Sequence, residues 1–148
     1  MRFDKQVFGG VAVLAIFAAG FVLGGLTQSG ELHAQSGDRV FELRTYTTNP
    51  GKLPNLQARF RDHTMRIFEQ HGMANVGYWT PQDAPSSANT LIYIISHPSR
   101  EAAANNWKEF GADPEWQEVA RESQVDGQIL AKRPDSVFMD ATDFSPMK

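Results

Sequence analysis

The order of short strand and helix patterns along residues 36–148 is β-α-β-β-α-β, which predicts an α+β fold. This order is typical of a ferredoxin-like sandwich, in which two helices cover one face of a four-stranded antiparallel sheet. Two further observations extend the prediction. Residues 90–96 (TLIYIIS) are apolar on both faces, and residues 7–26 form an uncharged apolar run. The doubly apolar residues 90–96 indicate that another layer covers the open face of the sheet. The apolar run of residues 7–26 indicates a hydrophobic helix ahead of the domain.

Residues 1–35 are predicted to be a membrane anchor or a signal peptide, followed by a linker. Arg2 and Lys5 precede the apolar run, which is long enough to cross a bilayer as a helix. The run exceeds the core of most signal peptides, yet a cleavage position follows Ala34. Both alternatives stay open. In either case we expect residues 36–148 outside the cytoplasm, membrane-anchored if the segment is retained and periplasmic or secreted if it is cleaved.

The first predicted strand covers residues 40–47 and has two unlike faces. Alternation puts Phe41, Leu43 and Thr45 on one face, and Val40, Glu42, Arg44 and Tyr46 on the other. If the first, apolar face meets the helices, the second face points away from them, toward the second sheet of a dimer. The NPG sequence at residues 49–51 then fits a type II turn.

The first predicted helix begins near Leu53, tolerates Pro54 in its first turn and ends at Gly72. Its apolar stripe, spaced three and four residues apart, is Leu56, Phe60, His63, Ile67 and the neighbouring Phe68. Because His63 lies within this stripe, we expect its imidazole to point toward the sheet.

The second helical segment is predicted to be broken. Ser99 is a good N-cap for its first part, whose stripe includes Trp107 and Phe110. Asp113 followed by Pro114 is typical of a new cap and a first helical position. The sequence therefore predicts two consecutive helices here.

The remaining strands are predicted at residues 74–80, 90–96 and 136–141. A single layer of helices covers only one face of the sheet, whereas residues 90–96 have no polar face to expose. A second copy of the same sheet would cover them. The sequence therefore predicts a homodimer that closes two sheets into a dimeric α/β barrel.

Composition excludes several classes of chemistry. The 148 residues have a net charge of −3 and no cysteine, which excludes disulfides, thiolate catalysis and cysteine-ligated metals. The composition is not basic enough to indicate a nucleic-acid partner. No phosphate loop, nucleophile elbow or paired histidine motif is present, so we expect no metal and no bound cofactor.

Three stretches carry a resemblance to a known family. VFELRTYTTNPGKL resembles the opening of NIPSNAP domains, a Glu-Leu-Arg-x-Tyr strand followed by a Pro-Gly-Lys turn. NNWKEFGADPEWQEVARES is similar to the tryptophan helix of the family and its Asp-Pro-Glu-Trp continuation, and FMDATDFSP to its closing strand. The resemblance covers residues 40–148, so we expect a NIPSNAP-like domain within residues 36–148.

The resemblance implies a dimeric α/β-barrel fold and little about chemistry. NIPSNAP domains are mostly of unassigned function, although mitochondrial members are linked to mitophagy signalling and protein partners. Relatives that share the dimeric barrel include cofactor-independent monooxygenases, haem-dependent enzymes and proteins similar to muconolactone isomerase. A shared fold does not transfer an activity.

Candidate site residues follow from the predicted faces. His63 is the candidate general base. The alternative is that His63 has only a structural role, at the edge of the apolar stripe. Arg44 and Tyr46 would line the lumen of the dimer, with Glu42 as the expected ion-pair partner of Arg44. The aromatic candidates for a pocket between the helices and the sheet are Tyr78, Trp79, Tyr93 and Trp107, each of which can equally be core.

Three functions stay open. The favoured one is a non-catalytic, exported or membrane-tethered dimer that binds a protein or a small apolar ligand. The alternative is a small cofactor-independent monooxygenase or isomerase that uses His63 and a tyrosine for proton transfer. A further alternative is haem binding, with His63 or His97 as the axial ligand.

Overall fold

The structure is a computed structural model that describes residues 39–148. The predicted anchor or signal segment therefore lies outside the described residues. Among residues 39–148, no helix combines the length and the apolar character that crossing a membrane requires.

Strands and helices follow one another in the predicted order. The strands are β1 (Val40–Thr47), β2 (Ala74–Trp79), β3 (Thr90–His97) and β4 (Asp135–Asp140). The first helical segment consists of α1 (Leu53–Arg59), the π-helical turn η1 (Phe60–Thr64) and α2 (Met65–Gln70). The second consists of α3 (Arg100–Ala112) and α4 (Pro114–Glu122), and a 3-10 turn, η2 (Ser86–Ala88), precedes β3.

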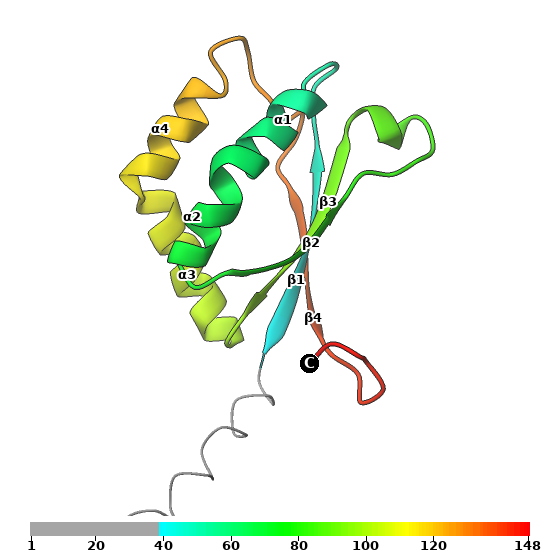
Figure 1. The fold of residues 1–148 in the computed structure, drawn as a ribbon, viewed down its shortest axis with the longest axis vertical. Helices are drawn as coiled ribbons and strands as arrows, with labels where there is room; N and C mark the ends of the chain where they lie inside the picture. The colour runs from blue at the N-terminus through cyan, green and yellow to red at the C-terminus, as the bar shows by residue number, and fades with distance from the viewer. Residues whose placement is uncertain (1–38) are drawn as a thin grey trace, which may run out of the picture. The chain divides into compact units, whose positions relative to one another are not determined.

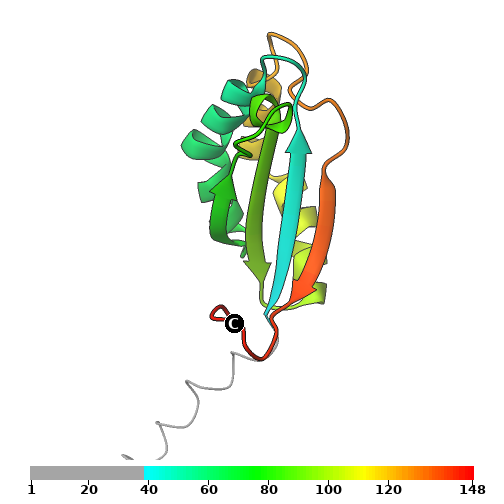
Figure 2. The same cartoon turned by 90° about the vertical axis from the view of Figure 1, so that its right-hand side faces the viewer.

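The four described strands form one antiparallel sheet in the order β2-β3-β1-β4, so that the two central strands are β3 and β1. All four α-helices of this part of the chain lie on the same side of the sheet (Figure 1). Figure 2 shows the sheet from its other side, which no helix covers. This is the predicted α+β, ferredoxin-like sandwich.

Turn and cap residues confirm the predicted boundaries. Gly51 has a φ of +75°, and the N–H of Lys52 donates to the carbonyl of Asn49, as a type II turn requires. The side chains of Ser99 and Asp113 accept the N-terminal N–H groups of α3 and α4. The break between the two helices therefore has the predicted local cause.

The inward face of the first helical segment passes through Thr64 and not through His63. Thr64, four positions after Phe60, is 1 % exposed, and Ile67, three positions further, is fully buried. His63 is exposed. The prediction that His63 points toward the sheet is therefore wrong: helical spacing allows either residue 63 or residue 64 to follow Phe60 on the inward face, and Thr64 occupies that position.

The helix-facing side of β1 is the opposite of the predicted one. Tyr46 is buried against Phe60 and Tyr93, and Arg44 lies over the indole of Trp107 in α3. The prediction that Arg44 and Tyr46 face away from the helices, into the lumen of a dimer, is therefore wrong. Glu42, Arg44 and Tyr46 of β1 have their polar or aromatic partners on the side of the sheet that the helices cover. The alternation of apolar and polar residues along β1 does not show where such partners lie.

The face of the sheet away from the helices is mainly apolar. By strand register, Leu43 lies beside Ile94 and Val137, and Trp79 lies beside Ile92. Trp79 is 51 % exposed and Val137 54 %. β3 therefore has apolar side chains on both faces, as its sequence predicts, and only one of these faces is covered by helices.

Candidate functional site

A buried polar network surrounds the carboxylate of Glu42, which is 1 % exposed. Its Oε1 accepts from Arg44 Nη1 at 2.8 Å and from Ser136 Oγ at 2.6 Å. Its Oε2 accepts from Trp107 Nε1 at 2.7 Å and lies 3.1 Å from His97 Nε2. These five residues, from β1, β3, β4 and α3, are called the Glu42 network below. The predicted ion pair between Glu42 and Arg44 is present within it.

The network keeps Glu42 ionised. Burial by itself raises the pKa of a carboxylate, but the hydrogen bonds from His97, Ser136, Arg44 and Trp107 outweigh it and lower the pKa of Glu42 from 4.5 to about 2. With its carboxylate oxygens accepting four bonds, Glu42 has little capacity left for a substrate. The network therefore joins three strands to α3 and is architectural.

The space between the helices and the sheet is filled by aromatic rings. The ring of Phe60 lies 5.1 to 5.8 Å, centroid to centroid, from the rings of Tyr46, Tyr78 and Tyr93. The hydroxyl of Tyr93 donates to that of Tyr46 at 3.0 Å. Burial raises the pKa of both Tyr78 and Tyr93, so their phenols stay protonated and do not act as bases near neutral pH.

An open groove runs along the edge of the sheet beside β2 and is called the β2-edge groove. Its volume is about 520 Å³. It is lined by Gln57, Phe60, Arg61, Met65, Tyr78, Trp79, Thr80 and Leu91. Most of these side chains are aromatic or aliphatic, and Gln57, Arg61 and Thr80 add polar groups. The groove can take an apolar molecule with a polar edge.

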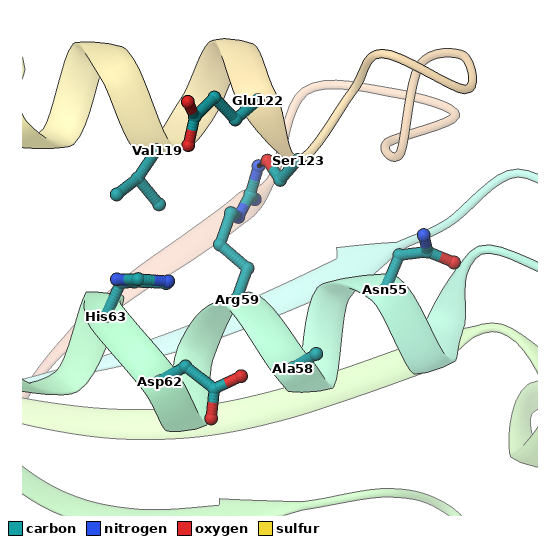
Figure 3. A pocket seen from close by; sticks show the side chains of 8 residues that line it. All are labelled: Asn55, Ala58, Arg59, Asp62, His63, Val119, Glu122 and Ser123. Carbon is teal, nitrogen blue, oxygen red and sulfur yellow. Dashed lines mark hydrogen bonds between the residues drawn. The ribbon is translucent and has the colours of Figure 1, made fainter.

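A second cleft, of about 290 Å³, separates the first helical segment from α4 (Figure 3) and is called the Arg59 cleft. Its walls are Asn55, Ala58, Arg59, Asp62 and His63 on one side, and Val119, Glu122 and Ser123 on the other. Figure 3 shows the side chain of Arg59 extending from α1 toward Ser123 at the end of α4. Arg59 is only 7 % exposed, so its charge lies at the base of the cleft.

The contacts of the Arg59 guanidinium are weak. Its Nη1 lies 3.4 Å from Ser123 Oγ, the group lies 5.2 Å from the ring centroid of Trp116, and its Nε has no hydrogen-bond partner. Desolvation lowers the pKa of Arg59, although a guanidinium stays charged in proteins. The cleft therefore has a buried positive charge at its base and the carboxylates of Asp62 and Glu122 on its walls.

The structure distributes the predicted site residues over three places. Arg44, Tyr46 and Tyr93 lie between the sheet and the helices, where Trp107 of α3 meets them, whereas Tyr78 and Trp79 line the β2-edge groove. His63 lies at the Arg59 cleft instead. The proton-transfer pair of His63 with a tyrosine is thus not assembled.

Neither His63 nor His97, the two histidines proposed as haem ligands, is placed to bind a haem. Both ring nitrogens of His97 are engaged, Nε2 by Glu42 and Nδ1 by Asn106 at 3.4 Å. His63 is exposed and borders a cleft of about 290 Å³, which is too small for a porphyrin. Among residues 39–148 no group of three histidine or acidic side chains is placed to hold a metal ion.

Arg59 is the site residue that sequence analysis missed. It stands three positions after Leu56 and directly before Phe60, so it occupies a stripe position of α1. A charged residue at such a position was the available signal. Nothing in the chain near Arg59 indicates that α4 would leave a cleft above it.

The chain was compared with known families and structures. The family model for NIPSNAP matches residues 41–146. No curated protein matches the chain. A NIPSNAP-like domain protein from Burkholderia xenovorans is 22% identical, with 73% of this chain and 89% of that chain covered and a TM-score of 0.62.

Two structures from Agrobacterium tumefaciens are similar. A NIPSNAP family protein of unknown function is 23% identical, covering 75% of this chain and 95% of that one, with a TM-score of 0.63. Another NIPSNAP family protein is 21% identical, covering 74% of this chain and 99% of that one, with a TM-score of 0.64. These similarities show the same fold. Because the family model spans nearly the whole described domain, the chain belongs to the NIPSNAP family.

Proposed function

We propose that this chain is a binding module: a homodimeric NIPSNAP domain on the outer side of a membrane that takes a small apolar molecule in the β2-edge groove. One observation carries this proposal. The groove is walled by Phe60, Tyr78 and Trp79, and its volume of about 520 Å³ lies within the range of about 300–1,000 Å³ that is typical of small-molecule sites.

The homodimer is supported by the uncovered face of the sheet. Ile92 and Ile94 of β3 lie on this face with Leu43 and Val137. A contiguous apolar patch of this kind is rare on soluble monomers. A second copy would cover it with the same surface, since a two-fold interface is self-complementary.

Trp79 connects the proposed dimer with the proposed ligand site. Its ring lies over Gly77 on the open face, where a Cβ at residue 77 would come within 2.5 Å of it. The same indole lines the β2-edge groove. A second copy on the open face would bury Trp79 and shelter this side of the groove from water.

The location outside the cytoplasm is proposed from residues 1–35 alone. Two basic residues followed by the uncharged run of residues 7–26 are typical of a segment that directs the following chain across a membrane. N-terminal sequencing of the mature chain tests the two forms. A start at or near residue 35 indicates a cleaved signal, and a start at residue 1 or 2 indicates an anchor.

The catalytic alternatives have less support. A cofactor-independent monooxygenase or isomerase would need His63 and a tyrosine in one cavity, but His63 borders a different cleft from Tyr78. The haem alternative would need a free imidazole in a large pocket, and His97 is bonded through both nitrogens. Binding requires only the surfaces that are present.

The test is native mass spectrometry of the full-length chain, combined with titration of the neutral fluorescent probe N-phenyl-1-naphthylamine. We expect a dimer, and roughly tenfold weaker probe binding to Trp79→Ala. Phe144→Ala is the matched control, because Phe144 is 84 % exposed outside the groove. A monomer contradicts the dimer, and equal binding to both variants contradicts the ligand site.

A further inference from the structure

Arg59, at the base of the Arg59 cleft, forms no ion pair with the acidic residues around it. Within residues 39–148, six ion pairs are formed, and none of them includes Arg59. Its Nε is buried without a hydrogen-bond partner, and its Nη1 has only the 3.4 Å contact with Ser123. A buried charge in this condition is costly unless something neutralises it.

The surroundings of Arg59 suit a planar anion. The guanidinium presents its N–H groups in a fork that matches a carboxylate. Ser123, His63 and Asn55 line the same cleft and can donate further hydrogen bonds. Figure 3 shows Arg59 and Ser123 side by side, with His63 farther along the same opening.

The charge of the cleft limits the anion to a single negative charge. Asp62 and Glu122 also line it, so a divalent phosphate would meet two carboxylates. A monocarboxylate gains the ion pair with Arg59 at half of that repulsion. Val119 and Ala58 provide an apolar wall for a short hydrocarbon chain.

We propose that the Arg59 cleft is a binding site for a small monocarboxylate, whose carboxylate is held by Arg59 and whose hydrocarbon chain lies along Val119. This site is separate from the β2-edge groove, with which it shares no lining residue. The proposal is independent of the proposed function, so an experiment can refute either binding site without affecting the other.

Glu122 is the competing partner for Arg59. It lines the same cleft, and rotation of its side chain could bring it to the guanidinium. A protein that pairs these two residues in solution would have no need of an external anion. The variants below distinguish this arrangement from ligand binding.

The experiment is calorimetric titration of sodium butanoate, and separately of inorganic phosphate, into the full-length chain. We expect saturable binding of butanoate, weaker binding of phosphate, and at least a tenfold loss of butanoate affinity in Arg59→Met. Arg133→Met is the matched control, since Arg133 is exposed and lines neither the Arg59 cleft nor the β2-edge groove. It should keep the affinity of the unmodified chain.

Two outcomes would overturn the proposal: no saturable binding of butanoate, or equal affinity in Arg59→Met and Arg133→Met. Tighter phosphate than butanoate binding would overturn the assignment to a monocarboxylate. Glu122→Gln provides a second arm that does not depend on the folding of Arg59→Met. If the cleft binds a carboxylate, this variant binds butanoate more tightly; a drop in both stability and affinity would show that Glu122 is the native partner of Arg59.

Discussion

Two arginines, Arg44 of β1 and Arg59 of α1, each lie largely out of solvent against a tryptophan, yet their surroundings differ. Arg44 stacks on Trp107 and donates to Glu42 at 2.8 Å. Arg59 lies against Trp116 with no carboxylate bonded to it. The comparison separates two uses of a buried charge. A charge that is bonded to a carboxylate holds elements together, whereas one without a carboxylate partner is available to a ligand.

The largest expected effect comes from removing the charge at the centre of the Glu42 network. We predict that Glu42→Gln loses about 3–5 kcal/mol of unfolding free energy, because it leaves Arg44 buried without its carboxylate. Denaturant unfolding measures this loss. Glu118→Gln is the control, since Glu118 forms only an ion pair at the surface, with Arg121. Similar small losses in both variants would contradict an architectural role for the network.

The pH dependence of stability should report the same carboxylate. The pKa of Glu42 in the folded chain, about 2, lies below its ordinary value of 4.5. Its contribution is therefore present above pH 4.5 and is lost as the pH falls toward 2, by about 3 kcal/mol in total. Unfolding measured between pH 6 and pH 2.5 should show this loss in the unmodified chain and a shallower one in Glu42→Gln. Parallel curves of unfolding free energy against pH for the two proteins would contradict the assignment of this loss to Glu42.

A smaller effect is expected from Arg44 itself. We predict that Arg44→Met loses about 2 kcal/mol, since one charged hydrogen bond to Glu42 disappears while Ser136, Trp107 and His97 continue to donate. Thermal or denaturant unfolding measures it. Arg61→Met, on the exposed side of the first helical segment, should stay within about 0.5 kcal/mol of the unmodified chain.

The smallest effect is expected at His63. Because this side chain is exposed, His63→Ala should change the unfolding free energy by less than about 0.5 kcal/mol. It should lower butanoate affinity less than Arg59→Met does. A loss of 2 kcal/mol or more would mean that His63 packs against the sheet.

Local signals were sufficient to predict the elements of this fold. The turn at Gly51, the caps Ser99 and Asp113 and the alternation in β1 depend on a few neighbouring residues each, and all were identified. The doubly apolar β3 was also recognised, since its pattern needs no knowledge of its neighbours.

The site required information from distant parts of the chain. Alternation shows that β1 has two faces, but the contacts of Glu42 with Trp107 and Ser136 decide which one the helices cover. Helical spacing allows either His63 or Thr64 to follow Phe60 on the inward face, and only the packing of the helix on the sheet shows that it is Thr64. Arg59 is buried by α4, which follows it by more than fifty residues.

The unfolding free energy of Arg59→Met in carboxylate-free buffer tests the contrast between the two arginines most directly. Methionine fills similar space without a charge, so removing an unpaired buried cation should leave stability unchanged or raise it. We predict a value equal to or above that of the unmodified chain. A loss of about 2 kcal/mol or more would show that Arg59 has a partner within the protein, and the difference between the two arginines would disappear.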